Sequence, residues 1–230
     1  LIMNCSTGIT SVLFDIDDVL CDSERFICEA AIEMFKRRHG VQVRAEDFLP
    51  FVGSGENRYL GGVAEKYGVQ IKLPEDKVFT YELYLEVIRN RLKALPGVSE
   101  FILKCRAKGI KLAVASAADT MKVNGNLAEI GLPHETFDAV VTGSDVSRHK
   151  PDPQCFLMAA KKIGICPANC LVIEDANNGC KAAKAAGAMC LGITSSFDSE
   201  QLAASGADWT ASDLAHLPGD LEAILAVGAK

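Results

Sequence analysis

The sequence predicts an α/β fold, a doubly wound parallel sheet into which an α-helical lobe is inserted. The first observation is a set of short apolar runs, typical of buried parallel strands, at residues 9–14, 110–115, 137–142 and 170–173. The second is that strand and helix patterns alternate from Gly97 onward, the rhythm of a doubly wound sheet. Together these patterns predict one sheet of parallel strands.

The third observation is a long segment without strand patterns that directly follows the first apolar run. From about residue 22 to about residue 95 the apolar residues recur at helical spacing, for example Phe26 and Phe35 on one stripe. A helical lobe is therefore inserted between the first strand and the rest of the sheet. We expect the core to comprise residues 9–21 and 96–230, and the helical lobe residues 22–95.

Glycines mark the ends of several predicted elements. Gly40 and Gly131 follow amphipathic stretches and are expected to end helices. The groups Gly53-Ser54-Gly55 and Gly61-Gly62 lack the spacing of a dinucleotide or Walker loop. We interpret them as turns and hinges of the helical lobe.

Composition and charge exclude several classes of function. The 230 residues are 49% hydrophobic, enough for a sizeable core, and the net charge of −6 argues against nucleic acid or a membrane as partner. No apolar stretch reaches the roughly 18 residues of a membrane span. Nine cysteines without a C-x-x-C pair favour a reducing compartment, with redox control by Cys166 and Cys170 as an open alternative. We expect a cytoplasmic monomer.

The most informative residues are Asp15 and Asp17, which stand where the first apolar run ends. In open α/β sheets ligands bind at the carboxyl ends of the strands. Two carboxylates this close repel each other unless they share a proton or a cation, so the pair predicts a divalent metal site or a raised pKa. For this pair alone, the alternative is that one Asp caps the helix that follows.

Three further runs also deliver polar residues to their ends. The second run ends at Ser116, the third is followed by Lys150, and the fourth ends in Glu174-Asp175. Taken singly, each has a structural explanation as a helix cap, a solvated loop charge or a favourable helix start. Those explanations do not account for all of these groups meeting at one edge of the sheet.

This ordered set of acids, serine and lysine resembles the four motifs of the haloacid dehalogenase superfamily of phosphotransferases, over about residues 10–215. The place of the helical lobe resembles the helical cap of the β-phosphoglucomutase group. The resemblance implies a Rossmann-like core, Mg²⁺ as cofactor, and a cap that closes over the site and excludes water.

The resemblance and the chemistry of phosphate esters together suggest a role for each residue. A carboxylate can attack a phosphate dianion only if a metal and a cationic side chain offset the repulsion. Asp15 is the expected nucleophile, which gives an aspartyl-phosphate, and Asp17 the expected general acid and base. The expected Mg²⁺ ligands are Asp15, Asp17, Glu174 and Asp175, and the expected phosphate-binding residues are Ser116, Ala117 and Lys150.

Three positions depart from the family pattern. Many capped relatives have Gly where this chain has Asp18, and the mutases have a proton-shuttling His where this chain has Ile27. An aliphatic side chain cannot transfer protons, which disfavours a sugar phosphomutase. Glu56 stands where mutases carry a phosphate-binding Arg, which favours a substrate with one phosphate and a hydroxylated or cationic remainder. Arg58 lies close by and could reverse that inference, so we expect Glu56 and Arg58 to set specificity.

The expected function is therefore Mg²⁺-dependent hydrolysis of a small phosphorylated metabolite. The alternative is a non-catalytic or regulatory module of a larger protein, although clustered carboxylates would not stabilise such a module. Residues 47–56 and 60–64 also resemble a phosphatase-like domain of plant thylakoid proteins. That likeness makes the plastid stroma an alternative to the cytoplasm.

Overall fold

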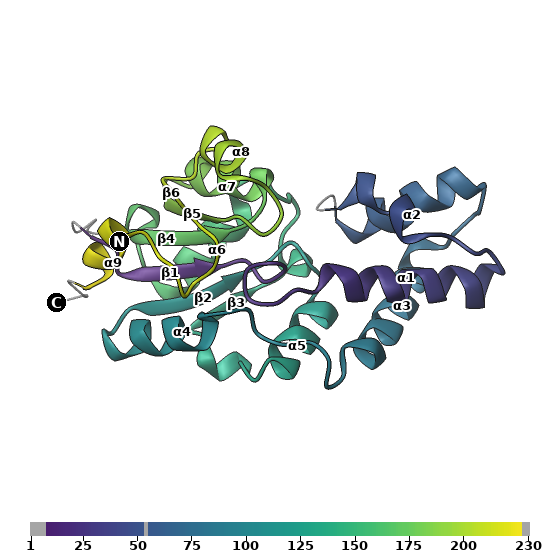
Figure 1. Ribbon diagram of the computed structural model, residues 1–230, viewed down its shortest axis with the longest axis horizontal. Helices are drawn as coiled ribbons and strands as arrows, with labels where there is room; N and C mark the ends of the chain where they lie inside the picture. Colours follow the sequence, from purple (N-terminus) through teal and green to yellow (C-terminus); the bar gives the residue numbers. More distant parts are fainter. Residues whose placement is uncertain (1–7, 53–54, 227–230) are drawn as a thin grey trace.

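A six-stranded parallel sheet forms the centre of the computed structural model, which describes residues 8–52 and 55–226. The strand order is β3-β2-β1-β4-β5-β6 (Figure 1). The central strand β1 pairs with β2 on one side and with β4 on the other, so the direction of winding reverses there. The strands are β1 (Ser11–Phe14), β2 (Lys111–Ala115), β3 (Ala139–Val141), β4 (Cys170–Glu174), β5 (Met189–Ile193) and β6 (Trp209–Ala211).

Helices cover both faces of this sheet, as the doubly wound prediction requires. Successive side chains of β1 point to opposite faces, so Phe14 packs in one apolar cluster with Phe101, and Leu13 in another with Phe156. Both clusters are buried, which explains the continuous apolar runs in the sequence. The core helices are α4 (Val98–Ala107), α5 (Thr120–Glu129), α6 (Gln154–Ile163), α7 (Asn177–Ala185), α8 (Ser199–Ala204) and α9 (Gly219–Ala226).

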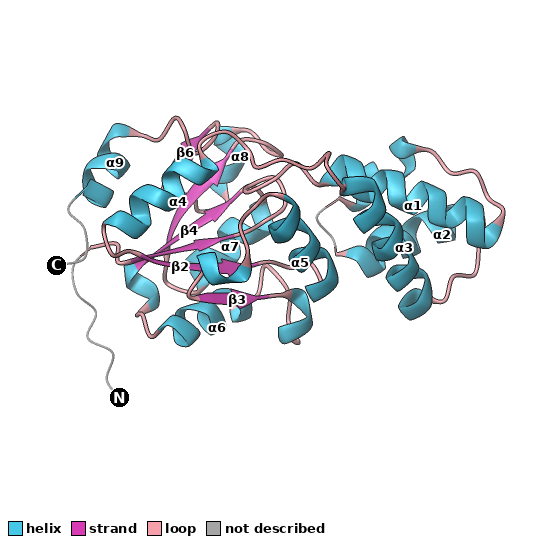
Figure 2. Cartoon of the chain, turned by 90° about the horizontal axis from the view of Figure 1, so that it is seen from below, coloured by secondary structure: helices cyan, strands magenta, loops and turns pink. Residues whose placement is uncertain are grey.

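The helical lobe lies beyond the carboxyl ends of the strands (Figures 1 and 2). Its described residues form α1 (Glu24–His39), α2 (Glu56–Tyr67), α3 (Leu73–Ile88) and two short 3₁₀ helices, Ala45–Asp47 and Leu49–Phe51. The two segments that join it to the sheet run side by side, since the Leu95 N–H donates to the Leu20 carbonyl at 2.9 Å. The boundaries at residues 21/22 and 95/96 stay a prediction, and they adjoin this hydrogen bond.

The predictions for the glycines have mixed outcomes. Gly40 ends α1 with a left-handed φ of 66°, and Gly131 follows α5 with a φ of 73°, so both helix ends are confirmed. The turn prediction for Gly61-Gly62 is wrong because both residues lie inside α2. A Cβ at Gly62 would lie 2.3 Å from the Phe51 ring, so close packing is the reason for glycine there. Gly53 and Ser54 lie outside the described residues.

Two further expectations concern membranes and cysteines. Within the described ranges, no helix is both long and apolar enough to cross a membrane. Cys170 carries a free, buried thiol that accepts a hydrogen bond from the Ser11 hydroxyl at 3.1 Å. It therefore forms no disulfide with Cys166, and the pair that the sequence left open is not a disulfide in this structure.

Candidate active site

A cavity of about 490 Å³ lies between the strand ends and the helical lobe. The sheet contributes Asp15, Ser116 and Glu174 to its wall, and the lobe contributes Glu56 and Tyr59. It opens next to β1, where the winding of the sheet reverses. This is the place where open α/β sheets bind their ligands.

Asp15 is fixed at the end of the central strand and shares one lysine with Glu174. The Asp15 N–H donates to the Ile173 carbonyl at 3.0 Å, which extends the β1–β4 ladder by one residue. Lys150 Nζ lies 2.6 Å from Asp15 Oδ1 and 2.5 Å from Glu174 Oε1. Burial raises the pKa of Asp15 to about 7 although Lys150 opposes the rise. Burial would lower the pKa of Lys150, but Asp15 and Glu174 hold it well above its usual value.

Glu174 and Asp175 lie beside each other but have different partners. Glu174 Oε2 accepts the backbone N–H groups of Asp175 and Ala176 at 3.0 and 3.1 Å, so its carboxylate faces Lys150 and its own turn. Gly179 leaves room for it, because a Cβ there would lie 1.9 Å from Glu174 Cδ. Asp175 Oδ2 accepts a hydrogen bond from the Ser196 hydroxyl. Burial, with Glu174 next in importance, raises the pKa of Asp175 well above its ordinary value.

These carboxylates suit a divalent cation. In the described part of the chain, no three His, Cys, Asp or Glu side chains are arranged as a ready-made metal site. Mg²⁺ does not need such a set, since one or two carboxylates and several waters are its usual ligands in enzymes that act on phosphate. Asp15, Glu174 and Asp175 gather near one buried lysine, and Glu174 adds to the effect of burial, the main cause, in raising the pKa values of Asp15 and Asp175. Asp15 and Asp175 therefore fit Mg²⁺ as carboxylate ligands, whereas ligation by Asp17 and by Glu174 stays a prediction.

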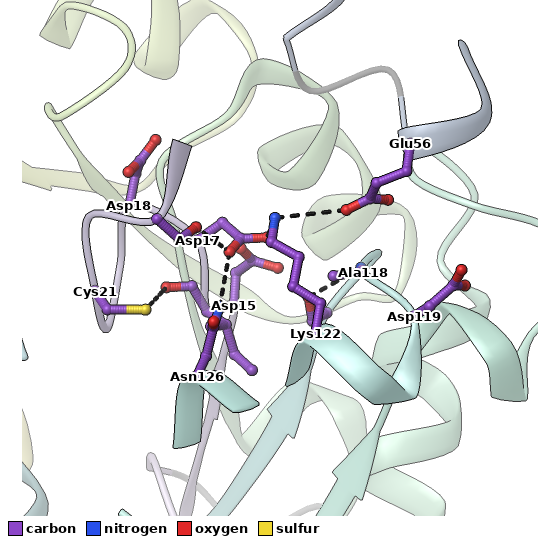
Figure 3. Close-up of polar contacts among 12 residues, drawn as sticks. Asp15, Asp17, Asp18, Cys21, Glu56, Ala118, Asp119, Lys122 and Asn126 are labelled. Atoms are coloured by element: carbon purple, nitrogen blue, oxygen red, sulfur yellow. Dashed lines mark hydrogen bonds and ion pairs between the residues drawn. The ribbon is translucent and has the colours of Figure 1, made fainter. Parts of the chain in front are cut away.

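Asp17 is held at both carboxylate oxygens. Ser23 Oγ and Asn126 Nδ2 donate to Oδ1, the latter at 3.2 Å, and Lys122 Nζ lies 2.9 Å from Oδ2 (Figure 3). Burial would lower the pKa of Lys122, but Asp17 and Glu56 raise it well above its usual value. The sequence reasoning missed Lys122 and Asn126. Their signal was polar residues at positions of the buried stripe of α5, beside Val123 and Leu127.

Asp18 adopts a conformation that explains the family preference for glycine. Its φ is 57°, in the left-handed region where glycine is favoured and Asp is among the better tolerated residues. Its side chain lines the cavity, where burial and the neighbouring Asp17 raise its pKa to about 7. The departure at this position therefore adds another carboxylate to an already acidic site.

Ser116 and Ala117 also line the cavity. The Ser116 N–H donates to the Val141 carbonyl at 3.0 Å, and its Oγ accepts the Ala118 N–H at 3.1 Å. The hydroxyl hydrogen of Ser116 is then left to donate to a ligand. Both residues line the same cavity as Lys150, as expected for phosphate-binding groups.

The lobe residues singled out in the sequence differ in where they lie. Glu56 lines the cavity at the start of α2, with Oε1 3.4 Å from Lys122 Nζ. Ile27, at the position of the mutase His, is buried in the cavity wall. Arg58 is half exposed, pairs with Glu65 at 2.9 Å and is not among the residues that line the cavity. Its role in specificity stays a prediction that this arrangement does not support.

The fold and the cavity define an α/β protein with a strand-end site of clustered carboxylates around a buried lysine. A model of the haloacid dehalogenase-like hydrolase family matches residues 9–187, and the chain belongs to that family. The resemblance of the ordered motifs to this family is thereby confirmed.

Two curated relatives and one solved structure illustrate the similarity. Protein SUPPRESSOR OF QUENCHING 1, chloroplastic, of Arabidopsis thaliana is 38% identical over 91% of this chain, which spans only 20% of that protein's length. The phosphorylated carbohydrates phosphatase of Thermotoga maritima is 30% identical over 77% of this chain and 81% of its own. CbbY of Rhodobacter sphaeroides, solved with xylulose-(1,5)bisphosphate, matches 90% of this chain and 95% of its own with a TM-score of 0.80. At 24% identity this last likeness shows the fold alone.

Proposed function

We propose that this chain is a Mg²⁺-dependent phosphatase that hydrolyses a small phosphorylated metabolite through an aspartyl-phosphate on Asp15. The observation that carries the proposal is the Asp15 carboxylate at the end of the central strand, 2.6 Å from Lys150 and in one cavity with Asp17 and Ser116. Relatives that are named as phosphatases support the same reaction.

In the first half of the reaction, Lys150, the Ser116 hydroxyl and the Ala117 N–H bind the phosphoryl oxygens. When bound, Mg²⁺ supplies the positive charge that lets a carboxylate approach a phosphate dianion. An oxygen of Asp15 attacks phosphorus, so that a new O–P bond forms and the ester P–O bond breaks. Asp17 gives its proton to the departing alkoxide.

In the second half, water releases the phosphate. Asp17, now ionised, takes a proton from a water molecule that attacks phosphorus. The bond between Asp15 and phosphorus breaks, inorganic phosphate leaves, and both carboxyl groups return to their starting states. Ile27 offers no group that could pass a proton to a second sugar hydroxyl, which supports hydrolysis over phosphomutase chemistry.

The lobe side of the cavity supports a substrate with a single phosphate. Glu24 and Glu56 line it. The lysines of its wall are already paired, since Lys122 contacts Asp17 and Glu56 while Lys77 lies 2.6 Å from Asp119. A second phosphate would meet carboxylates there, whereas hydroxyl or amino groups would find acceptors. We therefore infer a monophosphate with a hydroxylated or cationic remainder.

The test is a phosphate-release screen over monophosphates and bisphosphates, with Mg²⁺ or with excess EDTA. We expect release from monophosphates with Mg²⁺ and loss of release in EDTA. Full activity in EDTA would overturn the metal assignment, and a preference for bisphosphates would overturn the inferred substrate. No release from any compound would favour the alternative of a non-catalytic module.

Location and assembly remain predictions. The relative named as chloroplastic supports the plastid stroma beside the cytoplasm as a place of action. Sedimentation of the purified chain would test the expected monomer.

A further inference from the structure

One face of helix α5 holds the carboxylate of Asp17. Lys122 Nζ lies 2.9 Å from Oδ2 and Asn126 Nδ2 lies 3.2 Å from Oδ1. The two residues are four apart, so they lie one above the other on the same side of the helix. Both are buried, with 3% and 0% of their surface exposed. Both donors are therefore largely shielded from bulk water, whereas the Asp17 side chain that they hold is 27% exposed toward the cavity.

Each of these two residues also contacts the helical lobe. Glu56 Oε1, at the start of α2, lies 3.4 Å from Lys122 Nζ (Figure 3). The Tyr84 hydroxyl, on α3, donates to Asn126 Oδ1 at 2.6 Å. Two single-residue bridges thus connect two helices of the lobe to the two oxygens of one core carboxylate.

The Tyr84 contact also decides which way the Asn126 amide faces. An amide side chain has an acceptor on one side and a donor on the other. With the Tyr84 hydroxyl donating to Oδ1, the Asn126 NH₂ group is turned toward Asp17. Helices α3 and α5 approach closely here, because a Cβ at Gly125 would lie 2.2 Å from Leu85 Cδ2. The contact consequently depends on the lobe being docked.

We propose that Lys122 and Asn126 are positioning residues through which docking of the helical lobe orients the Asp17 carboxyl group toward the leaving group. The inference rests on the proposed function of Asp17 as general acid and base. Removal of the lobe takes Glu56 from Lys122 and Tyr84 from Asn126, so Asp17 loses the fixed geometry of its donors. Proton transfer is thereby confined to the state in which the lobe covers the substrate.

The test compares an alkyl phosphate, whose leaving group needs a proton, with an aryl phosphate, whose leaving group does not. Lys122→Met should lower kcat on the alkyl substrate by about 10- to 100-fold, the lower part of the range for acid–base catalysis, and change the aryl rate by less than about threefold. Glu56→Gln and Tyr84→Phe remove only the lobe side of each bridge. Each should lower the ratio of the alkyl kcat to the aryl kcat by about three- to tenfold. Lys122→Arg keeps the cation and should restore part of the alkyl rate.

Two comparisons separate positioning from general damage. Adding Lys122→Met to Asp17→Asn should cause no further loss on the alkyl phosphate, because Lys122 acts through Asp17. The matched control is Lys77→Met, which removes another ion pair between lobe and core, with Asp119, and does not touch Asp17. It should change the alkyl and aryl rates by the same factor.

Equal losses on both substrates in Lys122→Met and Glu56→Gln would overturn the proposal. A changed KM with an unchanged alkyl-to-aryl ratio in Glu56→Gln would return Glu56 to the specificity role predicted from the sequence. If Lys122→Met does not fold, the rates of Glu56→Gln and Tyr84→Phe decide.

If the unmodified chain releases no phosphate, the proposed function fails separately. Crystal structures of the unmodified chain and of Tyr84→Phe then test the inference. Asp17 and Asn126 side chains in unchanged positions would then overturn it.

Discussion

The two ends of the cavity are each built around a buried lysine that bridges two carboxylates. Lys150 joins Asp15 and Glu174, and all three residues belong to the sheet-bearing core. Lys122 joins Asp17 of the core to Glu56 of the helical lobe. The first arrangement is anchored by strand ends whose backbones are hydrogen-bonded to one another, whereas the second spans two parts of the molecule.

The difference teaches which part of the site is preorganised. The backbone of Asp15 is fixed by the β1–β4 ladder, and its lysine partner also belongs to the core, so none of these contacts involves the lobe. The surroundings of Asp17 are complete only when α2 and α3 reach α5. In the proposed reaction, the surroundings of the nucleophile Asp15 are thus preorganised within the core, and those of the acid–base residue Asp17 are completed by docking of the lobe.

The largest expected effect comes from replacing the nucleophile. Asp15→Asn keeps the shape but removes the attacking oxygen and a metal ligand, so we expect turnover to fall by about 10⁴-fold or more. Phosphoenzyme, trapped in acid, should disappear with it. Asp22→Asn, an exposed carboxylate paired with Arg25, serves as the control and should keep near-normal turnover. Undiminished phosphoenzyme in Asp15→Asn would show that the nucleophile is another group.

Lys150→Met sharpens the comparison between the two lysines. In the proposed reaction Lys150 binds the phosphoryl group, so its loss should lower kcat by about 10²- to 10³-fold on alkyl and aryl phosphates alike. It also leaves Asp15 and Glu174 buried and unpaired, which should cost about 3–5 kcal/mol of unfolding free energy. Kinetics on both substrates and urea unfolding measure the two effects. A loss confined to the alkyl phosphate would make Lys150 resemble Lys122 and break the comparison.

Without metal, the clustered carboxylates of the cavity should make the free energy of unfolding depend on pH. The folded-state pKa values of Asp15 and Asp18 are about 7, above the ordinary value for Asp, so the folded chain holds protons that the unfolded chain has released. The unfolding free energy in EDTA should therefore fall as pH rises from about 4 to about 7, by on the order of a few kcal/mol, and level off above. Groups whose pKa is lowered in the folded state, such as Asp76, change the free energy of unfolding only at pH values below about 4.

Urea unfolding at pH 5, 6, 7 and 8, in EDTA and in Mg²⁺, measures this dependence. Mg²⁺ binds the ionised carboxylates of the folded state, so it should reduce the loss at pH 7 and 8. Asp18→Asn should flatten the slope in EDTA, whereas Asp213→Asn, far from the cavity lining, should leave it unchanged. A flat profile in EDTA would contradict the raised pKa values of Asp15 and Asp18.

The smallest expected effect belongs to Arg58. Its guanidinium pairs with Glu65 on α2, and both side chains are exposed. Exposed ion pairs of this kind contribute about 0–1 kcal/mol to the free energy of unfolding. Arg58→Ala should change kcat/KM by less than about twofold and leave the order of substrates intact. A reordered substrate panel would show instead that Arg58 reaches the substrate, as the sequence suggested.

The sequence by itself was sufficient for the fold and for the residues at the strand ends. A buried parallel strand has to be a short apolar run, and the residue that follows it has to emerge at the carboxyl edge of the sheet. Asp15, Ser116 and Glu174 could therefore be placed together before any packing was known, whereas Lys150, well beyond β3, was placed with them by the family resemblance. β5 and β6 were not among the apolar runs singled out in the sequence, although they continue the strand–helix alternation expected after Gly97.

Only the tertiary structure decided what surrounds Asp17. The contact between Lys122 and Asp17 joins residues 105 positions apart, on α5 and after β1. The contact between Tyr84 and Asn126 forms where α3 packs on α5, with Leu85 against Gly125. Arg58 likewise faces Glu65 and not the cavity, although it is only two residues from Glu56. The positions at strand ends follow from the regular geometry of the backbone. Side-chain partners on different helices depend instead on how two helix surfaces pack, and local sequence patterns do not encode that packing.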